Sequence, residues 1–527
     1  MPQLDPVRLE IFRSLFSSVA EEMGATLMRS ASSPNIKERR DYSCAIFNGN
    51  GELIAQGEHM PVHLGSMPLS VQAAIDEMEF EPGDVVLLND PFRGGTHLPD
   101  LTMIMPVFIE VSEEPTFFMA NRAHHADVGG MSPGSMPVST EIYQEGQIIP
   151  PVKWRAAGDL NDDLQRTLLA NVRTPVERKE DLAAQEASLK VGAKRTRELT
   201  KRYGLGVVQN FMTQVLDYSD TLMRKELEEI PDGTYIAEDY LDDDGSTAEP
   251  VKIRCTIRID EDTADVDFSG SAPQVRGSLN AVSAITFSAT VYCFRCMAEN
   301  DIPVNEGCFR PLTVIAPKGT VVNATRPAAV AGGNVETSQR IVDVVLKALS
   351  RAVPERIPAA SQGTMNNVAI GGTDNNGEPF GYYETIAGGM GARPSKDGIS
   401  GIHNHMTNTM NTPIEALETS YPFRITEYRF RDFTGGTGTY RGGDGIIRSL
   451  QVLCDCSVTV LSERRIFSPY GLQGGNTGFQ GLNILTRKDG NMEGMPSKFN
   501  IQLRAGDVLT IETPGGGGYG KPEHIHD

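Results

Sequence analysis

Two segments that mix histidine and aspartate with glycine and proline constrain this chain more than any other feature. They are NDPFRGGTHLPD (89–100) and NRAHHADVGG (121–130), and their candidate metal ligands are His97, Asp100, His124, His125 and Asp127. Pro99 separates His97 from Asp100, so a turn rather than a regular helix must present that pair. Imidazole nitrogen with carboxylate oxygen suits Zn, Mn or Fe(II), and an open coordination position allows water activation. We therefore expect a catalytic metal site on loops, with a hydrogen-bonded polar network as the alternative.

The order of residues in HHAD (124–127) decides which side chains share a face. If this stretch is extended, His124 points away from His125 and Asp127, because side chains alternate along a strand. Only one face can ligate a metal directly, and residues on the other face would orient ligands or act as bases. The residues alone leave open which face that is.

Two further histidines and one arginine are candidates for substrate contacts near this site. Pro61 lies between His59 and His63 and argues against a zinc-binding helix, so the two histidines either pack over the site as a loop or face the substrate. Arg93 precedes two glycines. It either helps to bind an anion or belongs to a tight turn that orients the His97 side chain towards the metal site.

A polar stretch in the last third, HNHMTNTMN (403–411), is the remaining candidate for a pocket. It contains His403, His405 and Asn408, which form either a substrate-facing wall or a buried hydrogen-bond network. The glycine-rich segments do not spell a nucleotide loop, because neither GxxxxGK[ST] nor a strand followed by GxGxxG and a helix occurs.

Charge and cysteine content exclude several classes of protein. With 48 basic and 69 acidic residues the net charge is −21, which argues against a nucleic-acid partner. An apolar run long enough to span a membrane is absent from the sequence, and its first residues do not resemble a secretory signal. Seven scattered cysteines favour reduced thiols in the cytoplasm. Cys293 and Cys296 form a CxxC, but in an apolar stretch that predicts a buried helix with two core thiols.

Hydrophobic patterns predict an α+β fold with several subdomains. Asp5 caps an expected amphipathic helix that Pro6 begins, and Thr174 and Pro175 open a charged helix that reaches about Tyr203. A second helix is expected over 207–227, and hairpins over 44–57 and 251–268. The glycine-rich stretch 400–520 indicates a β-sandwich or barrel-like arrangement, in which TPGGGGYG (513–520) allows close backbone packing. A doubly wound α/β fold is not expected, since sustained βαβ alternation is missing.

Three regions follow from these patterns. Residues 1–170 carry the metal-binding motifs, residues 171–350 form a central helical and β region, and residues 351–527 form a glycine-rich region dominated by strands. We expect all three to belong to one continuous domain.

Motifs spread along almost the whole chain resemble the hydantoinase B/5-oxoprolinase family. They are ERRDYSCA (38–45), HLGSM (63–67), NDPFRGGTHLPD (89–100), AHHADVGG (123–130), EIYQEGQIIPP (141–151), GGNVETSQR (332–340) and TPGGGGYG (513–520). The family contains subunits of ATP-dependent N-methylhydantoinases and caprolactamase-like lactamases, subunits of acetone and acetophenone carboxylases, and the second half of fused 5-oxoprolinases.

The resemblance implies a division of labour between two subunits. A hydantoinase A-like partner with an actin/hexokinase-type ATPase fold binds ATP and phosphorylates the substrate's carbonyl oxygen, and the present chain completes the reaction at a divalent metal (Zn, Mn or Fe). The family's metal motifs fall on Asp41, His97, Asp100 and His124. His125 or Asp127 would then act as general base or orient the water.

Three functions are compatible with these motifs. The leading interpretation is the metal-dependent subunit of an ATP-dependent hydrolase of a hydantoin, a lactam or 5-oxoproline, in an α2β2 or similar complex. The alternatives are a subunit of a ketone carboxylase and a non-catalytic scaffold for the ATPase partner. The sequence identifies neither the substrate nor the metal.

Overall fold

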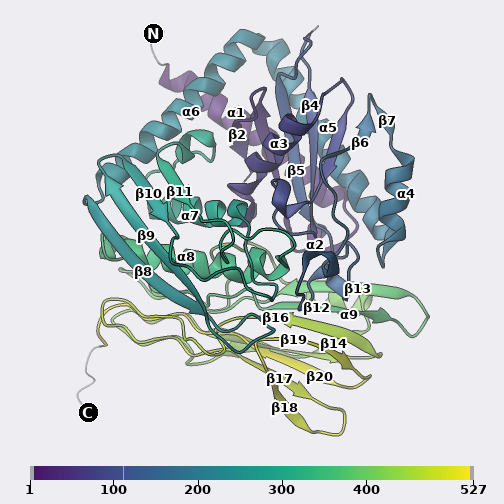
Figure 1. Ribbon diagram of the computed structural model, residues 1–527, viewed down its shortest axis with the longest axis vertical. Helices are drawn as coiled ribbons and strands as arrows, with labels where there is room; N and C mark the ends of the chain where they lie inside the picture. Colours follow the sequence, from purple (N-terminus) through teal and green to yellow (C-terminus); the bar gives the residue numbers. More distant parts are fainter. Residues whose placement is uncertain (1–4, 58, 111, 523–527) are drawn as a thin grey trace.

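The computed structural model describes residues 5–57, 59–110 and 112–522, which form four β-sheets and nine α-helices (Figure 1). The first sheet has the strand order β2-β1-β5-β4-β3-β6-β7, and all its neighbouring strands are antiparallel. Its strands are β1 (Tyr42–Asn48), β2 (Leu53–Gln56), β3 (Val85–Leu88), β4 (Asp100–Val107), β5 (Phe117–His124), β6 (Val152–Ala156) and β7 (Asp159–Leu160).

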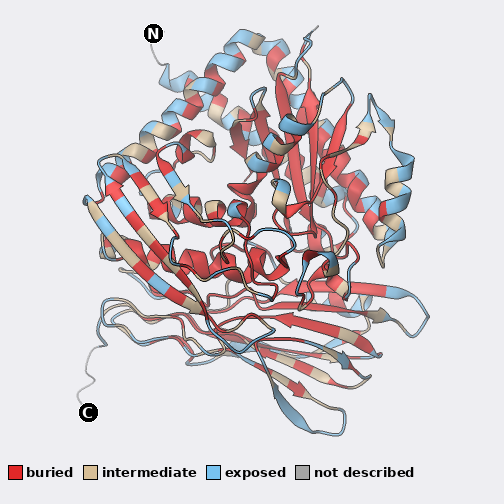
Figure 2. Cartoon of the chain, in the orientation of Figure 1, coloured by how far each residue is buried: buried red, intermediate tan, exposed pale blue. Residues whose placement is uncertain are grey.

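Helices cover both faces of this sheet. Helix α5 packs on the face to which Asn121 points, and α3 packs on the opposite face, to which Arg122 points. Every residue of β4 and β5 is therefore buried (Figure 2). The helices of this region are α1 (Pro6–Ser30), α2 (Pro34–Lys37), α3 (Ser66–Glu77), α4 (Asp162–Ala170) and α5 (Pro175–Tyr203).

The central region contains a second sheet of order β11-β10-β9-β8, in which only the β10–β11 pair is parallel among the described strands. Helix α8 packs against β8, β9 and α7. The elements are α6 (Leu205–Glu228), β8 (Gly233–Leu241), β9 (Val251–Asp260), β10 (Thr263–Asp267), α7 (Ser283–Met297), β11 (Leu312–Ile315) and α8 (Ser338–Leu349).

Two antiparallel sheets of the C-terminal third share a separate hydrophobic core, and Figure 1 shows them as the lower layer of the molecule. Their orders are β13-β12-β16-β19 and β14-β15-β20-β17-β18. The elements are β12 (Asn367–Thr373), β13 (Pro379–Thr385), α9 (Ile414–Ser420), β14 (Phe423–Arg431), β15 (Gly445–Val452), β16 (Cys456–Leu461), β17 (Leu482–Thr486), β18 (Met492–Met495), β19 (Lys498–Leu503) and β20 (Val508–Glu512).

The expected helices and hairpins form close to their predicted bounds. The Asp5 side chain accepts the Arg8 N–H and caps α1, and Gly204 ends α5. The Thr174 side chain makes no capping hydrogen bond within the described structure, so Pro175 starts α5 without it. Both predicted hairpins form, as β1–β2 and β9–β10, and the sandwich begins earlier than expected, at β12.

The prediction of two core thiols in α7 is wrong for one of them. Cys293 is buried, as expected, but Cys296 is exposed. The two residues are three positions apart in the last turns of α7, and Cys296 lines two clefts rather than the core. Within the described part of the chain, no helix is both long and apolar enough to cross a membrane.

The GGGG stretch 515–518 runs between four other segments without being part of a regular strand. Successive N–H groups donate to the carbonyl oxygens of different neighbours, namely Phe479, Gly443, Ala360 and Asn476. A Cβ added at Gly516 would collide with the carbonyl oxygen of Met390, and one at Gly517 with that of Tyr470. Glycine is therefore required here for close backbone packing, as the sequence predicted.

Replacing either glycine should destabilise the C-terminal region. We expect Gly516→Ala or Gly517→Ala to lower the free energy of unfolding by about 1–3 kcal/mol, the usual cost of forcing extra atoms into a packed interior. Gly494→Ala is the matched control, since a Cβ at Gly494 meets no described atom within 4 Å. Urea denaturation of the three variants and the wild type measures the difference. Equal stability of Gly516→Ala and Gly494→Ala would contradict this account of the packing.

Candidate metal centre

Strand pairing brings the two histidine–aspartate motifs together. Asp100 begins β4 and His124 ends β5, and in the antiparallel register the two residues are Cα partners. The turn that precedes β4 depends on glycine: Gly94 has φ +84°, and a Cβ there would collide with the carbonyl oxygen of Leu69. This turn places His97 next to the strand ends that carry Asp100 and His124.

Ligand atoms of His97, Asp100 and His124 all lie within 4.8 Å of one another, and all three residues are buried. The Asp100 Oδ1 atom is 3.1 Å from His97 Nε2 and 3.4 Å from His124 Nδ1. Its other oxygen, Oδ2, accepts a 2.6 Å hydrogen bond from the Thr96 hydroxyl. Among the described residues, no other group of His, Cys, Asp and Glu side chains meets this geometry.

The hydrogen bonding of His97 leaves one ring nitrogen available as a ligand. Nδ1 lies 3.4 Å from the carbonyl oxygen of Ala331, a partner that favours a hydrogen on Nδ1 and a free lone pair on Nε2. Nε2 of His97 and Nε2 of His124 make no well-directed hydrogen bond to any described residue, although both are buried. Buried polar atoms are rarely left without a partner, so these residues fit a divalent cation.

The surroundings of the cluster shift the pKa values of Asp100 and His124. Burial alone would raise the pKa of Asp100, but His97, His124 and His63 hold the pKa of this carboxyl well below its ordinary value. Burial lowers the pKa of His124 and outweighs the opposing effect of Asp100 and Asp41. Asp100 is therefore a carboxylate and His124 a neutral imidazole at neutral pH, the protonation states that metal ligation requires.

Asp41 and His63 line a small cavity beside the cluster, together with Asp100 and His124. The cavity has a volume of about 10 Å³, roughly the space of one water molecule. His63 is fixed from both sides, because Nδ1 lies 2.9 Å from Ser43 Oγ and Nε2 lies 3.4 Å from Asp100 Oδ2. Asp41 is outside the group of His97, Asp100 and His124, and its carbonyl oxygen accepts the His124 N–H.

Sequence reasoning did not single out three residues that complete this site. Thr96 binds Asp100, and Asn334 lines the cavity. Tyr383 of β13 stacks on the His124 ring, with centroids 4.5 Å apart and an interplanar angle of 13°. Thr96 could have been suspected from its place next to His97, and Asn334 from its place in the motif GGNVETSQR (332–340), whereas Tyr383 is more than two hundred residues away and carried no local signal.

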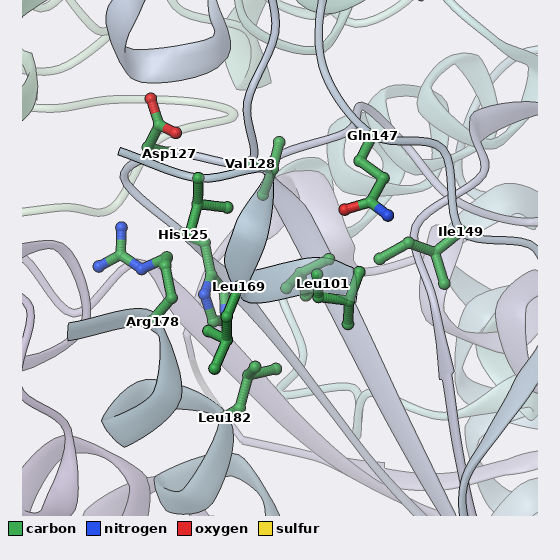
Figure 3. Close-up of a pocket in the computed structure, with 11 residues that line it drawn as sticks. Leu101, His125, Asp127, Val128, Gln147, Ile149, Leu169, Arg178 and Leu182 are labelled. Carbon is green, nitrogen blue, oxygen red and sulfur yellow. The ribbon is translucent and has the colours of Figure 1, made fainter. Parts of the chain in front are cut away.

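The side chains of His125 and Asp127 point away from the cluster, towards Gln185 and Arg173. His125 Nε2 is 2.9 Å from Gln185 Oε1 of α5, and burial together with Arg178 lowers the pKa of His125 to about 4. The Asp127 carboxylate accepts a 2.8 Å hydrogen bond from Arg173. Both residues line a separate pocket of about 20 Å³, which Figure 3 shows with Arg178. The structure does not bring them to the cavity, so this geometry does not support their expected catalytic role.

Four of the expected substrate-binding residues surround two neighbouring clefts. His403, His405 and Asn408 line a cleft of about 660 Å³, and His59 lines a second one of about 340 Å³. The clefts share the lining residues Pro61, Tyr292, Cys296 and Asn408. The larger cleft shares Thr407 with the small cavity, and the smaller cleft shares Met60 with it, so both adjoin the cluster.

Arg93 is placed away from these spaces. Its guanidinium pairs with Glu77 at 2.7 Å and lies 3.7 Å from Asp90. It lines another pocket, of about 500 Å³, with Arg326 and Phe92. Of the substrate-binding residues expected from the sequence, His63 is thus in the cavity, four are in the adjoining clefts, and Arg93 is in neither.

Comparison with known proteins agrees with the motifs. The Hydantoinase B/oxoprolinase family model matches residues 5–522. An uncharacterised protein of Methanocaldococcus jannaschii is 44% identical over 98% of this chain and 91% of its own length. A 5-oxoprolinase of Dictyostelium discoideum is 40% identical over 99% of this chain, which spans only 41% of that relative. The B-type subunit of a putative D-/L-hydantoinase from a Pseudomonas species is 31% identical over 99% of this chain and 91% of its own length.

Solved structures show the same fold. The ATP-dependent caprolactamase of Pseudomonas jessenii superposes with a TM-score of 0.92 at 31% identity, covering 98% of this chain and 92% of that one. A nucleotide-free acetone carboxylase matches with a TM-score of 0.91 at 19% identity, covering 98% and 76%, which is a likeness of fold. A family match along nearly the whole chain, relatives at 40% identity and more, and this fold together show that the chain belongs to the hydantoinase B/oxoprolinase family.

Proposed function

We propose that this chain is the metal-dependent subunit of an ATP-dependent cyclic-amide hydrolase that acts on a hydantoin, a lactam or 5-oxoproline. The observation that carries the proposal is the buried His97–Asp100–His124 group beside a water-sized cavity that adjoins two clefts. The relatives named as 5-oxoprolinase, D-/L-hydantoinase and caprolactamase support the class of substrate.

We assign the metal to His97, Asp100 and His124, with Asp41 as the fourth ligand from the cavity wall. Two imidazoles and two carboxylates accept Zn, Mn or Fe(II). When bound, the divalent ion would supply Lewis acidity for the attack of water on the activated carbonyl carbon.

The remaining steps divide between this chain and its partner. Resonance makes an unstrained ring amide resist water, and phosphorylation of the carbonyl oxygen removes that resonance and leaves an electrophilic carbon. Water adds to this carbon, the C–N bond then breaks as the ring nitrogen takes a proton, and hydrolysis of the resulting acyl phosphate releases inorganic phosphate. We assign ATP and the phosphorylation to a hydantoinase A-like partner subunit. The fused relatives support this division, because the chain matches only 41% of the Dictyostelium 5-oxoprolinase and leaves the rest of that protein for another function.

Within this chain, we assign the positioning of the attacking water to His63. Its ring is held between Ser43 and Asp100 and lines the cavity, so it is near the ligands without belonging to the proposed ligand set. A general base must reach the proton that it removes, and His125 and Asp127 are directed elsewhere. The clefts beside His59, His403, His405 and Asn408 supply the approach for the substrate.

Removal of Asp100 tests the metal site. We expect Asp100→Ala to lose its metal and to lower product formation about 100-fold or more, since even outer-shell changes cost 10–100-fold. ATP hydrolysis by the partner should continue without product. The chain should stay folded, because this carboxylate is surrounded by polar groups rather than by the apolar core. Metal content, circular dichroism and product formation are measured on one preparation.

Asp242→Ala is the matched control for this experiment. Asp242 is equally buried, but its carboxylate accepts the N–H groups of Arg465, Ile466 and Phe467. This variant should lose stability and keep its metal. Normal metal content in Asp100→Ala would remove Asp100 from the site, and full product formation by a metal-free complex would favour a scaffold.

A substrate assay separates hydrolysis from carboxylation. The chain and its ATPase partner are incubated with ATP and either lactams, hydantoins and 5-oxoproline or the ketones acetone and acetophenone, with and without bicarbonate. We expect ring opening of a cyclic amide without added bicarbonate. Turnover that occurs only with a ketone and bicarbonate would refute the hydrolase and establish the carboxylase alternative.

Assembly with the partner follows from the chemistry. A phosphorylated amide is labile in water, so its transfer between two active sites has to be enclosed. We therefore expect sedimentation of the co-purified subunits to give an α2β2 or similar complex that persists at micromolar concentration. A chain that sediments as a monomer in the presence of its partner would contradict an enclosed transfer.

A further inference from the structure

A π-helical turn, Gly333–Thr337, contributes Asn334 to the lining of the cavity. The proposed reaction assigns no role to this side chain. The turn directly precedes α8, and a Cβ at Gly333 would collide with the carbonyl oxygen of Asn280. Its backbone is therefore held tightly against the segment around residue 280. Single π-turns within helices occur frequently at functional sites.

Asn334 on this turn lines the cavity together with Asp100, His124 and His63, and its carboxamide oxygen lacks a hydrogen-bond partner among the described residues. The residue is only 4% exposed. The Oδ1 atom accepts no hydrogen bond from any residue that the structure describes. Buried acceptors are rarely left without a partner, so the position is expected to be filled by a ligand in the working enzyme.

We infer that Asn334 recognises the cis amide edge of the ring substrate; the inference rests on the proposed function. In a small ring the N–H and C=O of the amide lie on the same side, whereas open-chain amides are almost always trans. An asparagine carboxamide offers one acceptor and one donor with the same spacing. Oδ1 accepts the ring N–H, and Nδ2 donates to the carbonyl oxygen.

This pairing fits the stage of the reaction that is assigned to this chain. The ring nitrogen loses its hydrogen when the partner phosphorylates the carbonyl oxygen, and it carries a hydrogen again in the adduct after water has added to the carbonyl carbon. A trans amide cannot occupy both atoms of the carboxamide at once. Asn334 is thus assigned the selection of cyclic amides over open-chain amides, a specificity role that involves no proton transfer.

Access to Asn334 requires movement of the cavity wall. The cavity holds about 10 Å³, too little for a ring, while the adjoining clefts hold about 660 and 340 Å³. Thr407 lines both the cavity and the larger cleft, and Met60 lines both the cavity and the smaller cleft. These two side chains must move when the amide edge enters.

The test compares lactams that differ only in the ring N–H. Binding of 2-pyrrolidone and ε-caprolactam, and of their N-methyl derivatives, to the zinc-loaded full-length chain is measured by ligand-observed NMR. In the complex with the ATPase partner and ATP, the same preference is read from kcat/KM. We expect the wild type to favour the N–H lactams about tenfold or more, and Asn334→Ala to reduce this preference to about twofold, as for loss of one buried hydrogen bond.

Two further variants keep the result interpretable. Asn483→Ala removes an equally buried carboxamide whose nitrogen donates to Ser462 and Pro496 and whose oxygen accepts from Arg465, and it should keep the wild-type preference. Asn334→Ser replaces the alanine variant if that protein fails to fold. Zinc content is measured throughout, and it should stay at the wild-type level in both Asn334 variants.

Each outcome decides the inference. An unchanged preference in folded Asn334→Ala or Asn334→Ser overturns it and leaves the hydrolase proposal intact. Loss of zinc in these variants also overturns it, since Asn334 would then be a metal ligand. If the wild-type complex opens no lactam, hydantoin or 5-oxoproline ring, the proposed function fails and the inference fails with it.

Discussion

The antiparallel pairing of β4 with β5 is the constraint on which the site depends. It makes Asp100 and His124 partners across the ladder and sets their side chains on the face of the sheet that α3 covers. A slip of one residue would turn every side chain of a strand to the opposite face. His125 would then meet Asp100, and His124 would point towards Gln185 of α5. Burial of both faces of β4 and β5 fixes the register against such a slip.

Burying a carboxylate beside imidazoles shapes the chemistry of the cluster. Asp100 is nearly inaccessible to water, and ionised groups tolerate burial only when they are paired. The imidazoles of His63 and His124 and the Thr96 hydroxyl provide that pairing. The orphaned Nε2 atoms of His97 and His124 then leave room for a cation that would complete the network. The small cavity lies next to wide clefts, and Thr407 and Met60 lie between it and them.

The C-terminal third takes part in this site although it has its own core. Tyr383 of β13 stacks on the His124 ring. The guanidinium carbon of Arg39 lies over the Tyr383 ring, 5.0 Å from its centroid. A buried ionic network joins this region to the centre: Arg464 binds Asp239 of β8 at 2.8 Å and Asp343 of α8 at 2.5 Å. Breaking such a buried pair typically costs about 3–5 kcal/mol, so the predicted regions are held together firmly.

The sequence by itself determined the local features of this protein. Proline in HLPD required a turn before Asp100, alternation in HHAD required His124 and His125 to diverge, and glycine in TPGGGGYG required close backbone contact. These follow from dihedral limits and side-chain periodicity, which act over a few residues. Tertiary structure decided the rest: which face of β5 meets Asp100, that Cys296 reaches a cleft, and that Asn334 and Tyr383 complete the cavity. Such choices depend on strand register and on contacts between residues hundreds of positions apart, and no local pattern encodes them.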